Sequence, residues 1–318
     1  MKTGDGLWAE VDELIALRAY ASLVFKRADK KSSSPLAGGY VSPFRGRGID
    51  FSEVRLYQPG DEIRSMDWRV TARTGKPHTK LFIEERERPV VFIQDFSPGM
   101  YFATRTAFKT VVASKIATVL AWAAAGHGDR IGAVLFNEQE SKIVKPVNGN
   151  RGVLNLIGQL SAWSKKSPTE FSEDQNALEK CLRHSRSIIR PGALVYVLSD
   201  FRGQNRQSEM LLSEISRHAD VVAIRVIDPI EHQLPGKANL KISDGHAFSM
   251  INTDNNDTAS NISLQNQLNE QRFNSFCIKH GIHSLTCLTN EDFLDVIRHG
   301  LAKRQSVKNT GVRNAGSF

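Results

Sequence analysis

Oxygen-bearing side chains follow two apolar stretches of this chain. Asp95 and Ser97 come at the end of the apolar stretch 90–95, and Asp200 follows the apolar stretch 193–198. Ligands of open parallel sheets bind outside the carboxyl ends of the strands, near the point where the strand order reverses. Mg²⁺ prefers carboxylate and hydroxyl oxygens. The spacing indicates a candidate magnesium site, and acids that only cap turns are the alternative interpretation.

This set of residues resembles the metal-ion-dependent adhesion site of the von Willebrand A fold. The family pattern is Asp-x-Ser-x-Ser at one strand end, a Thr in a second loop and an Asp in a third. Asp95, Ser97 and Asp200 match it, whereas Gly99 stands at the second Ser and the expected second loop, residues 145–153, contains no Thr. The resemblance implies a degenerate site on a partner-facing edge, with Mg²⁺ there as the one cofactor to consider.

A second group of charged residues lies between positions 44 and 87, where arginines are interleaved with acids. Arginine forks pair bidentately with carboxylates and fix geometry. The group is therefore either an internal salt-bridge network, with Trp68 as its buried anchor, or a face that docks a partner. The candidate residues are Arg45, Arg47, Arg55, Tyr57, Gly60, Asp61, Arg64, Asp67, Trp68, Arg69 and Arg73.

Part of this group closely resembles the signature of a bacterial family, domain of unknown function 58. The signature is Arg-x-Tyr-x-x-Gly-Asp-x-x-Arg-x-x-Asp-Trp-x-x-x-Ala-Arg. In this sequence it falls on Arg55, Tyr57, Gly60, Asp61, Arg64, Asp67, Trp68, Ala72 and Arg73. The resemblance covers about residues 40–230. It implies partnership with a MoxR-type AAA+ ATPase and with membrane-anchored von Willebrand A proteins, in systems that resemble chaperone or maturation machinery.

The elements that would position these residues follow from the hydrophobic pattern. After residue 89, continuous apolar stretches alternate with helical patterns, which is typical of a parallel sheet covered on both faces. We expect an α/β fold with a doubly wound, mostly parallel sheet, of von Willebrand A type by resemblance. We expect an N-terminal helix and loop (1–34), a small β-rich subdomain (35–89), the α/β domain (90–302) and a basic flexible tail (303–318).

Composition places the chain among ordinary globular proteins. Its 318 residues are 40% hydrophobic and 24% charged, with a net charge of +8. Its three cysteines form no CxxC pair, which fits a reducing compartment. The most apolar stretch, 111–125, contains Lys115 and is too short to span a bilayer. We expect a cytoplasmic protein that does not insert directly into a membrane.

The chemistry-bearing motifs favour binding over turnover. The sequence lacks the GxxxxGK[ST] and GxGxxG nucleotide motifs, and it has neither a GxSxG elbow nor an HExxH helix. We expect a non-enzymatic interaction module, an accessory of a MoxR-type ATPase in maturing client proteins, which binds no nucleic acid. Two alternatives stay open: a metal-dependent hydrolase using Asp95 and Asp200, and a nucleic-acid-binding protein suggested by the positive charge.

Overall fold

The computed structural model divides into two compact units. Residues 33–87 form the smaller unit, and Met1–Ser32 together with Arg88–Phe318 form the larger. The structure describes residues 6–25, 49–58, 61, 63–84, 87–166, 176–232, 239–243, 248–252 and 256–302. Arg45, Arg47, Gly60 and the expected basic tail lie outside the described residues.

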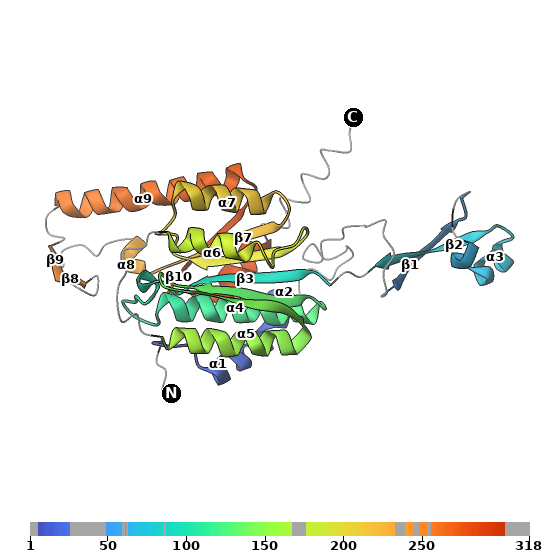
Figure 1. Ribbon diagram of the computed structural model, residues 1–318, viewed down its shortest axis with the longest axis horizontal. Helices are drawn as coiled ribbons and strands as arrows, with labels where there is room; N and C mark the ends of the chain where they lie inside the picture. Colours follow the sequence, from blue (N-terminus) through green and yellow to red (C-terminus); the bar gives the residue numbers. More distant parts are fainter. Residues whose placement is uncertain are drawn as a thin grey trace. The chain divides into compact units, whose positions relative to one another are not determined.

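A six-stranded sheet forms the centre of the larger unit, with the strand order β10-β7-β6-β3-β4-β5 (Figure 1). All neighbours pair in parallel except β4 and β5, which are antiparallel. The predicted α/β class with a mostly parallel sheet is confirmed. The strands are β3 (Pro89–Asp95), β4 (Arg130–Phe136), β5 (Ser141–Asn148), β6 (Leu194–Ser199), β7 (Asp220–Ile227) and β10 (His283–Leu288).

Helices cover both faces of this sheet, as a doubly wound fold requires (Figure 1). On one face lie α1 (Val11–Ala16), α2 (Arg18–Phe25), α4 (Lys109–Gly126) and α5 (Gly149–Ser164). On the other lie α6 (Ala177–Ser185), α7 (Arg206–Ser216) and α9 (Asn256–Lys279). The short α8 (Pro229–His232) follows β7, and residues 293–302 form a final helix.

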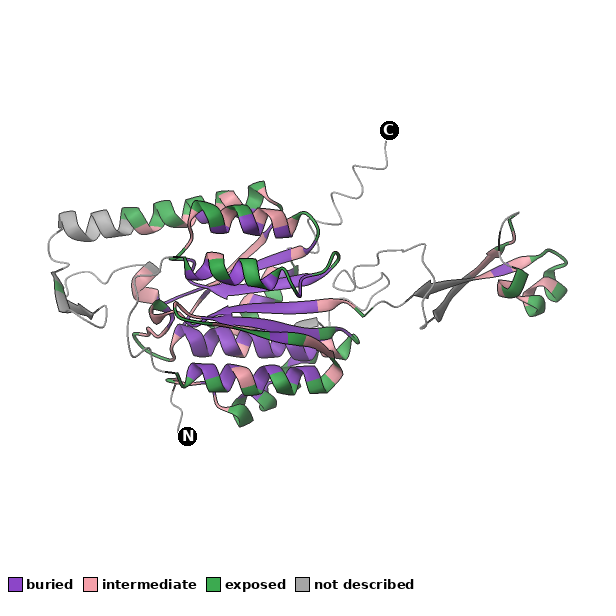
Figure 2. Cartoon of the chain, viewed as in Figure 1, coloured by how far each residue is buried: buried purple, intermediate pink, exposed green. Residues whose placement is uncertain are grey.

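Burial explains why these stretches become strands. In β3 every residue after Pro89 is buried, and β6 is buried throughout (Figure 2). Side chains of a strand alternate between the two faces, so a strand covered on both sides must be apolar along its whole length. Val91 and Ile93 pack with α6, α7 and α9. Gln94 faces the opposite way, and its amide donates to Ser114 Oγ on α4 at 2.8 Å.

Two helical expectations need correction. The helical spacing of apolar residues over 8–27 predicts one helix, but the structure has two short helices, which pack in the larger unit, α1 against α5 and α2 against α4. The pattern of residues 104–126 predicts a helix from residue 104, but α4 begins only at Lys109. The amide and the hydroxyl of Thr104 instead donate to the Asp228 carboxylate at 2.9 and 2.6 Å. These hydrogen bonds hold the residues before α4 in a loop.

The described part of the smaller unit is an antiparallel pair of strands with a short helix. The strands are β1 (Ile49–Leu56) and β2 (His78–Glu84), and between them lie the turn η1 (Ile63–Ser65) and α3 (Trp68–Thr74). Asp67 begins α3 by accepting hydrogen bonds from the amides of Arg69 and Val70, which satisfies donors that the first helical turn leaves unpaired. Gly75 ends the helix in the left-handed region, at a φ of 67°.

The pattern of residues 236–260 predicts a β-hairpin or a loop excursion, and their described part contains a short antiparallel pair, β8 (Asn239–Ser243) and β9 (Phe248–Asn252). Among the helices that the structure describes, none combines the length and the apolar character needed to cross a bilayer.

Candidate functional site

Asp95 and Asp200 lie at the carboxyl edge of the sheet, on either side of the point where the strand order reverses. Asp95 ends β3, and Asp200 directly follows β6. These strands pair in parallel, with Gln94 opposite Leu198. The chain leaves β3 towards β4 and then returns to β6 on the other side, so the switch point of the sheet falls between the two acids. The predicted adjacency of the two strand ends is confirmed.

Both carboxylate oxygens of Asp95 are already engaged by neighbouring groups. Oδ1 accepts the Ser97 amide at 2.8 Å, and Oδ2 accepts the Ser199 hydroxyl at 2.5 Å. The residue is 6% exposed. Burial, followed by the nearby charge of Asp200, raises the pKa of Asp95, although these hydrogen bonds oppose the shift. The folded environment therefore disfavours the charged form of Asp95.

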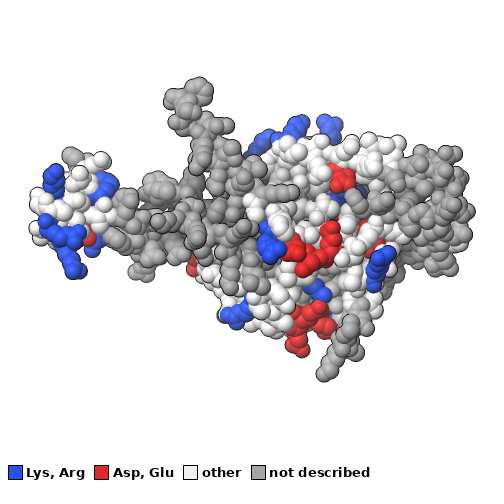
Figure 3. Space-filling view, turned by 180° about the vertical axis from the view of Figure 1, so that it is seen from behind, with Lys and Arg blue, Asp and Glu red and all other residues white. Residues whose placement is uncertain are grey.

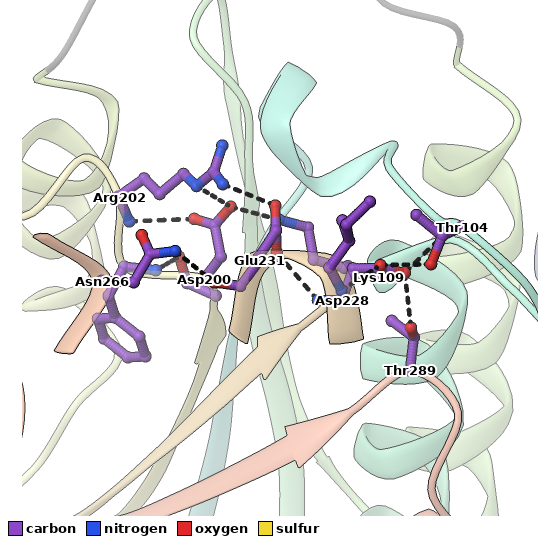
Figure 4. Close-up of polar contacts among 11 residues, drawn as sticks. Thr104, Lys109, Asp200, Arg202, Asp228, Glu231, Asn266 and Thr289 are labelled. Carbon is purple, nitrogen blue, oxygen red and sulfur yellow. Dashed lines mark hydrogen bonds and ion pairs between the residues drawn. The ribbon is translucent and has the colours of Figure 1, made fainter. Parts of the chain in front are cut away.

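Asp200 instead has a cation against it (Figure 4). Lys109, at the start of α4, donates from Nζ to Asp200 Oδ2 at 2.7 Å. The same Nζ donates to Glu231 of α8, at 2.9 Å from Oε1 and 3.1 Å from Oε2. The side chain of Lys109 is 0% exposed. Burial alone would raise the pKa of Asp200, but the charges of Lys109 and then Arg202 lower it overall.

Arg202 adds a second positive charge at the surface of this group. Its Nη2 lies 2.8 Å from Glu231 Oε1, and its Nε lies 3.8 Å from Asp200 Oδ2 (Figure 4). Its side chain is 64% exposed, so the guanidinium faces solvent while Lys109 does not. We call Lys109, Asp200, Arg202 and Glu231 the Lys109 cluster.

Backbone strain accompanies the cluster. Phe201 is the only described residue other than glycine with a positive φ, at 58°. Such a conformation persists when surrounding contacts fix it, and it is commonest at functional sites. Here the Phe201 amide donates to Ser199 Oγ at 2.9 Å, and the Phe201 ring packs on Phe273 with 4.6 Å between centroids. The turn after β6 is thus held so that Asp200 and Arg202 share one edge.

A further buried carboxylate, that of Asp228, joins three segments beside the cluster. Asp228, which follows β7, accepts hydrogen bonds from Thr104 and from the Thr289 hydroxyl, the latter at 2.9 Å (Figure 4). These hydrogen bonds lower the pKa of Asp228 despite its burial. From α9, Asn266 donates to the carbonyl of Glu231 at 2.7 Å. These hydrogen bonds and ion pairs therefore join α4, α8 and α9 to the ends of β6, β7 and β10.

The expected second loop is not at this edge. β5 runs antiparallel to β4, and its last residue, Asn148, pairs with Arg130, the first residue of β4. Residues 145–153 therefore lie at the amino end of the sheet, and the expectation that they face Asp95 is wrong. The residues that do follow β4 at the carboxyl edge begin at Asn137.

The cluster does not fit a divalent cation beside Asp200. An ion about 2.1 Å from Asp200 Oδ2 would lie within about 5 Å of Lys109 Nζ, which is 2.7 Å from the same oxygen. Two positive charges on an ion and one on lysine would repel by about 7 kcal/mol at an effective dielectric of about 20. The other oxygen, Oδ1, accepts the Arg202 amide at 3.0 Å. No group of three or more His, Cys, Asp or Glu suited to a metal occurs in the described residues.

In the smaller unit, the two acids of the family signature, Asp61 and Asp67, bind neighbouring groups. Arg55 Nη2 lies 2.6 Å from Asp61 Oδ1, and Asp61 Oδ2 accepts the Gln58 amide at 2.9 Å. Asp67 caps α3, with Lys80 Nζ at 3.9 Å. These contacts lower the pKa of both acids, mainly through the amides of Gln58 and Val70, respectively. The acids therefore organise the local chain.

Three arginines and the tryptophan of this segment are exposed instead. Trp68 is 65% exposed, so its interpretation as a buried anchor is wrong. It is the first residue of the short α3, and its side chain faces solvent. Within the described residues, no ion pair involves Arg64, Arg69 or Arg73. We call the exposed side chains the Trp68 surface: Ile63, Arg64, Trp68, Arg69 and Arg73.

Sequence reasoning missed Lys109, Glu231 and Asp228. The available signal for Lys109 was a charged residue directly before the apolar stretch 111–125, at the amino end of the helix that follows β3. In a parallel sheet, the helix that follows a strand begins at the carboxyl edge, so this position lies near the strand ends. Glu231 and Asp228 follow the strand that ends at Ile227, and they carried the same signal as Asp200.

Comparisons with known proteins add the following findings. The family model "Protein of unknown function DUF58" matches residues 53–274. Uncharacterized proteins of Mycobacterium bovis and Mycobacterium tuberculosis are 29% identical over 218 residues, which cover 69% of this chain and 67% of theirs.

Among solved structures, the conserved hypothetical protein BatB from Bacteroides thetaiotaomicron matches with a TM-score of 0.40 and 10% identity, covering 69% of this chain and 99% of that chain. An aerotolerance-related membrane protein from Bacteroides fragilis matches with a TM-score of 0.36 and 13% identity, covering 57% and 88%.

Proposed function

This chain belongs to the family of proteins of unknown function DUF58, and on that premise we propose that it is a non-enzymatic interaction module that docks a protein partner through the Trp68 surface. The partner in this proposal is a MoxR-type AAA+ ATPase, which the module assists in chaperone-like maturation of client proteins. The module works in the cytoplasm beside membrane-anchored von Willebrand A proteins. Its own sheet is, in the same proposal, of von Willebrand A type.

The observation that carries the proposal is the exposure of Trp68 within the most specific motif of the chain. Tryptophan and arginine are the residue types most often found to dominate binding energy at interfaces. Here Trp68 and Ile63, each 65% exposed, stand among three arginines without described ion pairs. Exposed apolar side chains with arginines near them in the sequence suit a partner surface that offers an apolar pocket and acids.

The internal contacts of the smaller unit support the same interpretation. Asp61 and Asp67 are occupied by Arg55 and by backbone amides, which fixes η1 and α3 relative to the strands. A surface held by such contacts loses little conformational freedom on binding, and this favours affinity. Within this motif, the acids hold the local structure in place, and the exposed arginines are available to a partner.

The edge of the larger unit is a second candidate contact in this proposal. Arg202 is 64% exposed there, within a strained turn that is fixed by Ser199 and Phe273.

The two alternative functions have less support. A metal-dependent hydrolase needs an ion at Asp200, where Lys109 already lies 2.7 Å from the carboxylate. Nucleic-acid binding needs a continuous basic surface that follows the phosphates. On the face of the larger unit drawn in Figure 3, acidic side chains gather in the middle and basic ones lie towards the edges. That distribution suits a protein partner better than a polyanion.

The test is direct binding between the purified full chain and the MoxR-type ATPase encoded in the same genome, by biolayer interferometry. Trp68→Ala is expected to weaken Kd about 30-fold or more, as removal of a hot-spot residue of about 2 kcal/mol does. The double variant Arg69→Ala/Arg73→Ala is expected to weaken binding and to make it less dependent on salt concentration.

Matched controls come from the larger unit, outside the Trp68 surface. Ile278→Ala removes an exposed apolar side chain that is 80% exposed, and Arg217→Ala removes an exposed arginine. Both are expected to bind as the wild type does. Wild-type affinity in Trp68→Ala and in the double arginine variant, with both proteins folded by circular dichroism, would remove the proposed role of this surface.

A further inference from the structure

We infer that the Lys109 ammonium is a built-in cation that takes the place of a divalent metal ion at the carboxyl edge of the sheet, so that this edge is metal-independent. The inference concerns the chemistry of the larger unit alone and does not rest on the docking role of the Trp68 surface.

The Lys109 ammonium lies between two carboxylates at the carboxyl edge of the sheet. Lys109 Nζ contacts Asp200 Oδ2 at 2.7 Å and Glu231 at 2.9 and 3.1 Å (Figure 4). It therefore bridges carboxylates from two separate segments, as a metal ion at such an edge does. Its side chain is 0% exposed, and a buried charge of this kind is retained only when it is paired.

The charges of the Lys109 cluster balance. Lys109 and Arg202 together carry two positive charges against the two negative charges of Asp200 and Glu231. Two further carboxyl groups at this edge have other partners: Asp95 binds Ser97 and Ser199, and Asp228 binds Thr104 and Thr289. The carboxylates of the Lys109 cluster are thus neutralised by the chain's own cations, and a divalent ion beside Asp200 would give the cluster excess positive charge.

Gly99 leaves space beside Asp200. A Cβ added at Gly99 would lie 3.3 Å from Asp200 Oδ2, the oxygen that accepts Lys109. Position 99 is where the adhesion-site pattern has its second serine. A glycine there contributes no hydroxyl to an ion and leaves the neighbourhood of Oδ2 to the ammonium. The pattern therefore departs from a metal site at the same oxygen that the lysine occupies.

The experiment measures Mn²⁺ binding and thermal stability of the full chain, without any partner. For the wild type we expect no Mn²⁺ binding by titration calorimetry or electron paramagnetic resonance. We also expect the Tm to be the same within about 1 °C in EDTA and in 5 mM MnCl₂, since the carboxylates are already paired. Wild-type Mn²⁺ binding that Asp200→Asn abolishes would overturn the inference.

The second arm removes the built-in cation. Lys109→Ala leaves Asp200 and Glu231 without their shared ammonium, so its Tm in EDTA should fall by roughly 6–20 °C. Mn²⁺ should then bind and restore part of the lost Tm, and adding Asp200→Asn should prevent both effects. A folded Lys109→Ala protein that binds no Mn²⁺, or one whose Tm is unchanged, would contradict the replacement of an ion by Lys109.

Lys109→Gln keeps a hydrogen-bond donor at this position without the charge. If Lys109→Ala does not fold, the Mn²⁺ binding and the Tm of Lys109→Gln are compared with those of the wild type instead. The wild-type arm decides the question of metal independence in either case. Since neither arm contains a partner protein, failure here leaves the docking proposal untouched, and failure of docking leaves this inference untouched.

Discussion

The Lys109 cluster and the Trp68 surface are built from similar residue types but use them in opposite ways. In the Lys109 cluster the central cation is fully buried and contacts two carboxylates. In the Trp68 surface the cations are exposed. The acids of the same motif accept hydrogen bonds in a turn and at a helix cap. Charge in the first region joins segments of the fold, whereas charge in the second is available to another molecule.

The difference has an energetic consequence. Removing one member of a buried ion pair leaves an uncompensated charge in the interior, which costs far more than the pair contributed. Removing an exposed charge changes little, because water replaces the lost contact. Stability should therefore respond to substitutions in the Lys109 cluster, and binding should respond to substitutions in the Trp68 surface.

The largest effect is expected for Lys109→Met, which should lower the free energy of unfolding by about 3–5 kcal/mol, because Asp200 and Glu231 lose their cation. Urea denaturation followed by circular dichroism measures the change. Lys165→Met is the matched control: Lys165 is 48% exposed and pairs with Glu10 at 3.3 Å, so it should cost under about 1 kcal/mol. Equal costs at the two positions would break the distinction between the regions.

The next effect concerns pH and Asp95. Burial and the charge of Asp200 raise the pKa of Asp95 from 3.8 to about 6. Between these values the folded state holds more protons than the unfolded state, so stability falls as pH rises through this window and stays lower above it. Asp95→Asn removes that loss and should be more stable than the wild type at pH 8, on the order of 1–3 kcal/mol.

Thermal denaturation at pH 4, 5, 6, 7 and 8 checks this prediction through the difference between wild type and Asp95→Asn. The difference is needed because the pKa of Asp129 is also raised to about 6 by burial and contributes with the same sign in both proteins. A difference that does not grow between pH 4 and 6 would show that Asp95 is charged at no cost.

A smaller effect is expected at the helix cap of the smaller unit. Asp67→Ala removes the acceptor for the amides of Arg69 and Val70 and should destabilise α3 by about 1 kcal/mol. Hydrogen–deuterium exchange of the α3 amides should become about fivefold faster. Asp67→Asn keeps a capping oxygen and should exchange nearly as the wild type does, and equal acceleration in both variants would point to the lost charge instead.

The smallest effect on stability is expected for Trp68→Ala, within about 0.5 kcal/mol of the wild type, because the side chain is 65% exposed. The same substitution at Trp163, which is 2% exposed in the larger unit, should cost about 3–5 kcal/mol. Differential scanning calorimetry compares the two. A large loss of stability in Trp68→Ala would make it a structural anchor and would weaken the docking proposal.

The sequence by itself determined most of the sheet of the larger unit. Apolar stretches that are continuous over six or so residues form strands only where both faces are covered, as in β4 and β6, whose residues are nearly all buried. Because such strands run in parallel, the acids that end two of them had to meet at one edge. The sequence therefore predicts that Asp95 and Asp200 lie at the same edge of the sheet.

The tertiary structure alone decided what these acids contact. Lys109, Glu231 and Asp200 are far apart in the chain, and their meeting depends on how α4 and α8 pack at the sheet edge. Likewise, only the reversal of β5 moved residues 145–153 to the opposite end of the sheet. A local pattern fixes which face of an element is apolar, but the partner of a buried charge is set by packing between distant segments. That is why the sequence suggested a metal ion at the position where the fold holds a lysine.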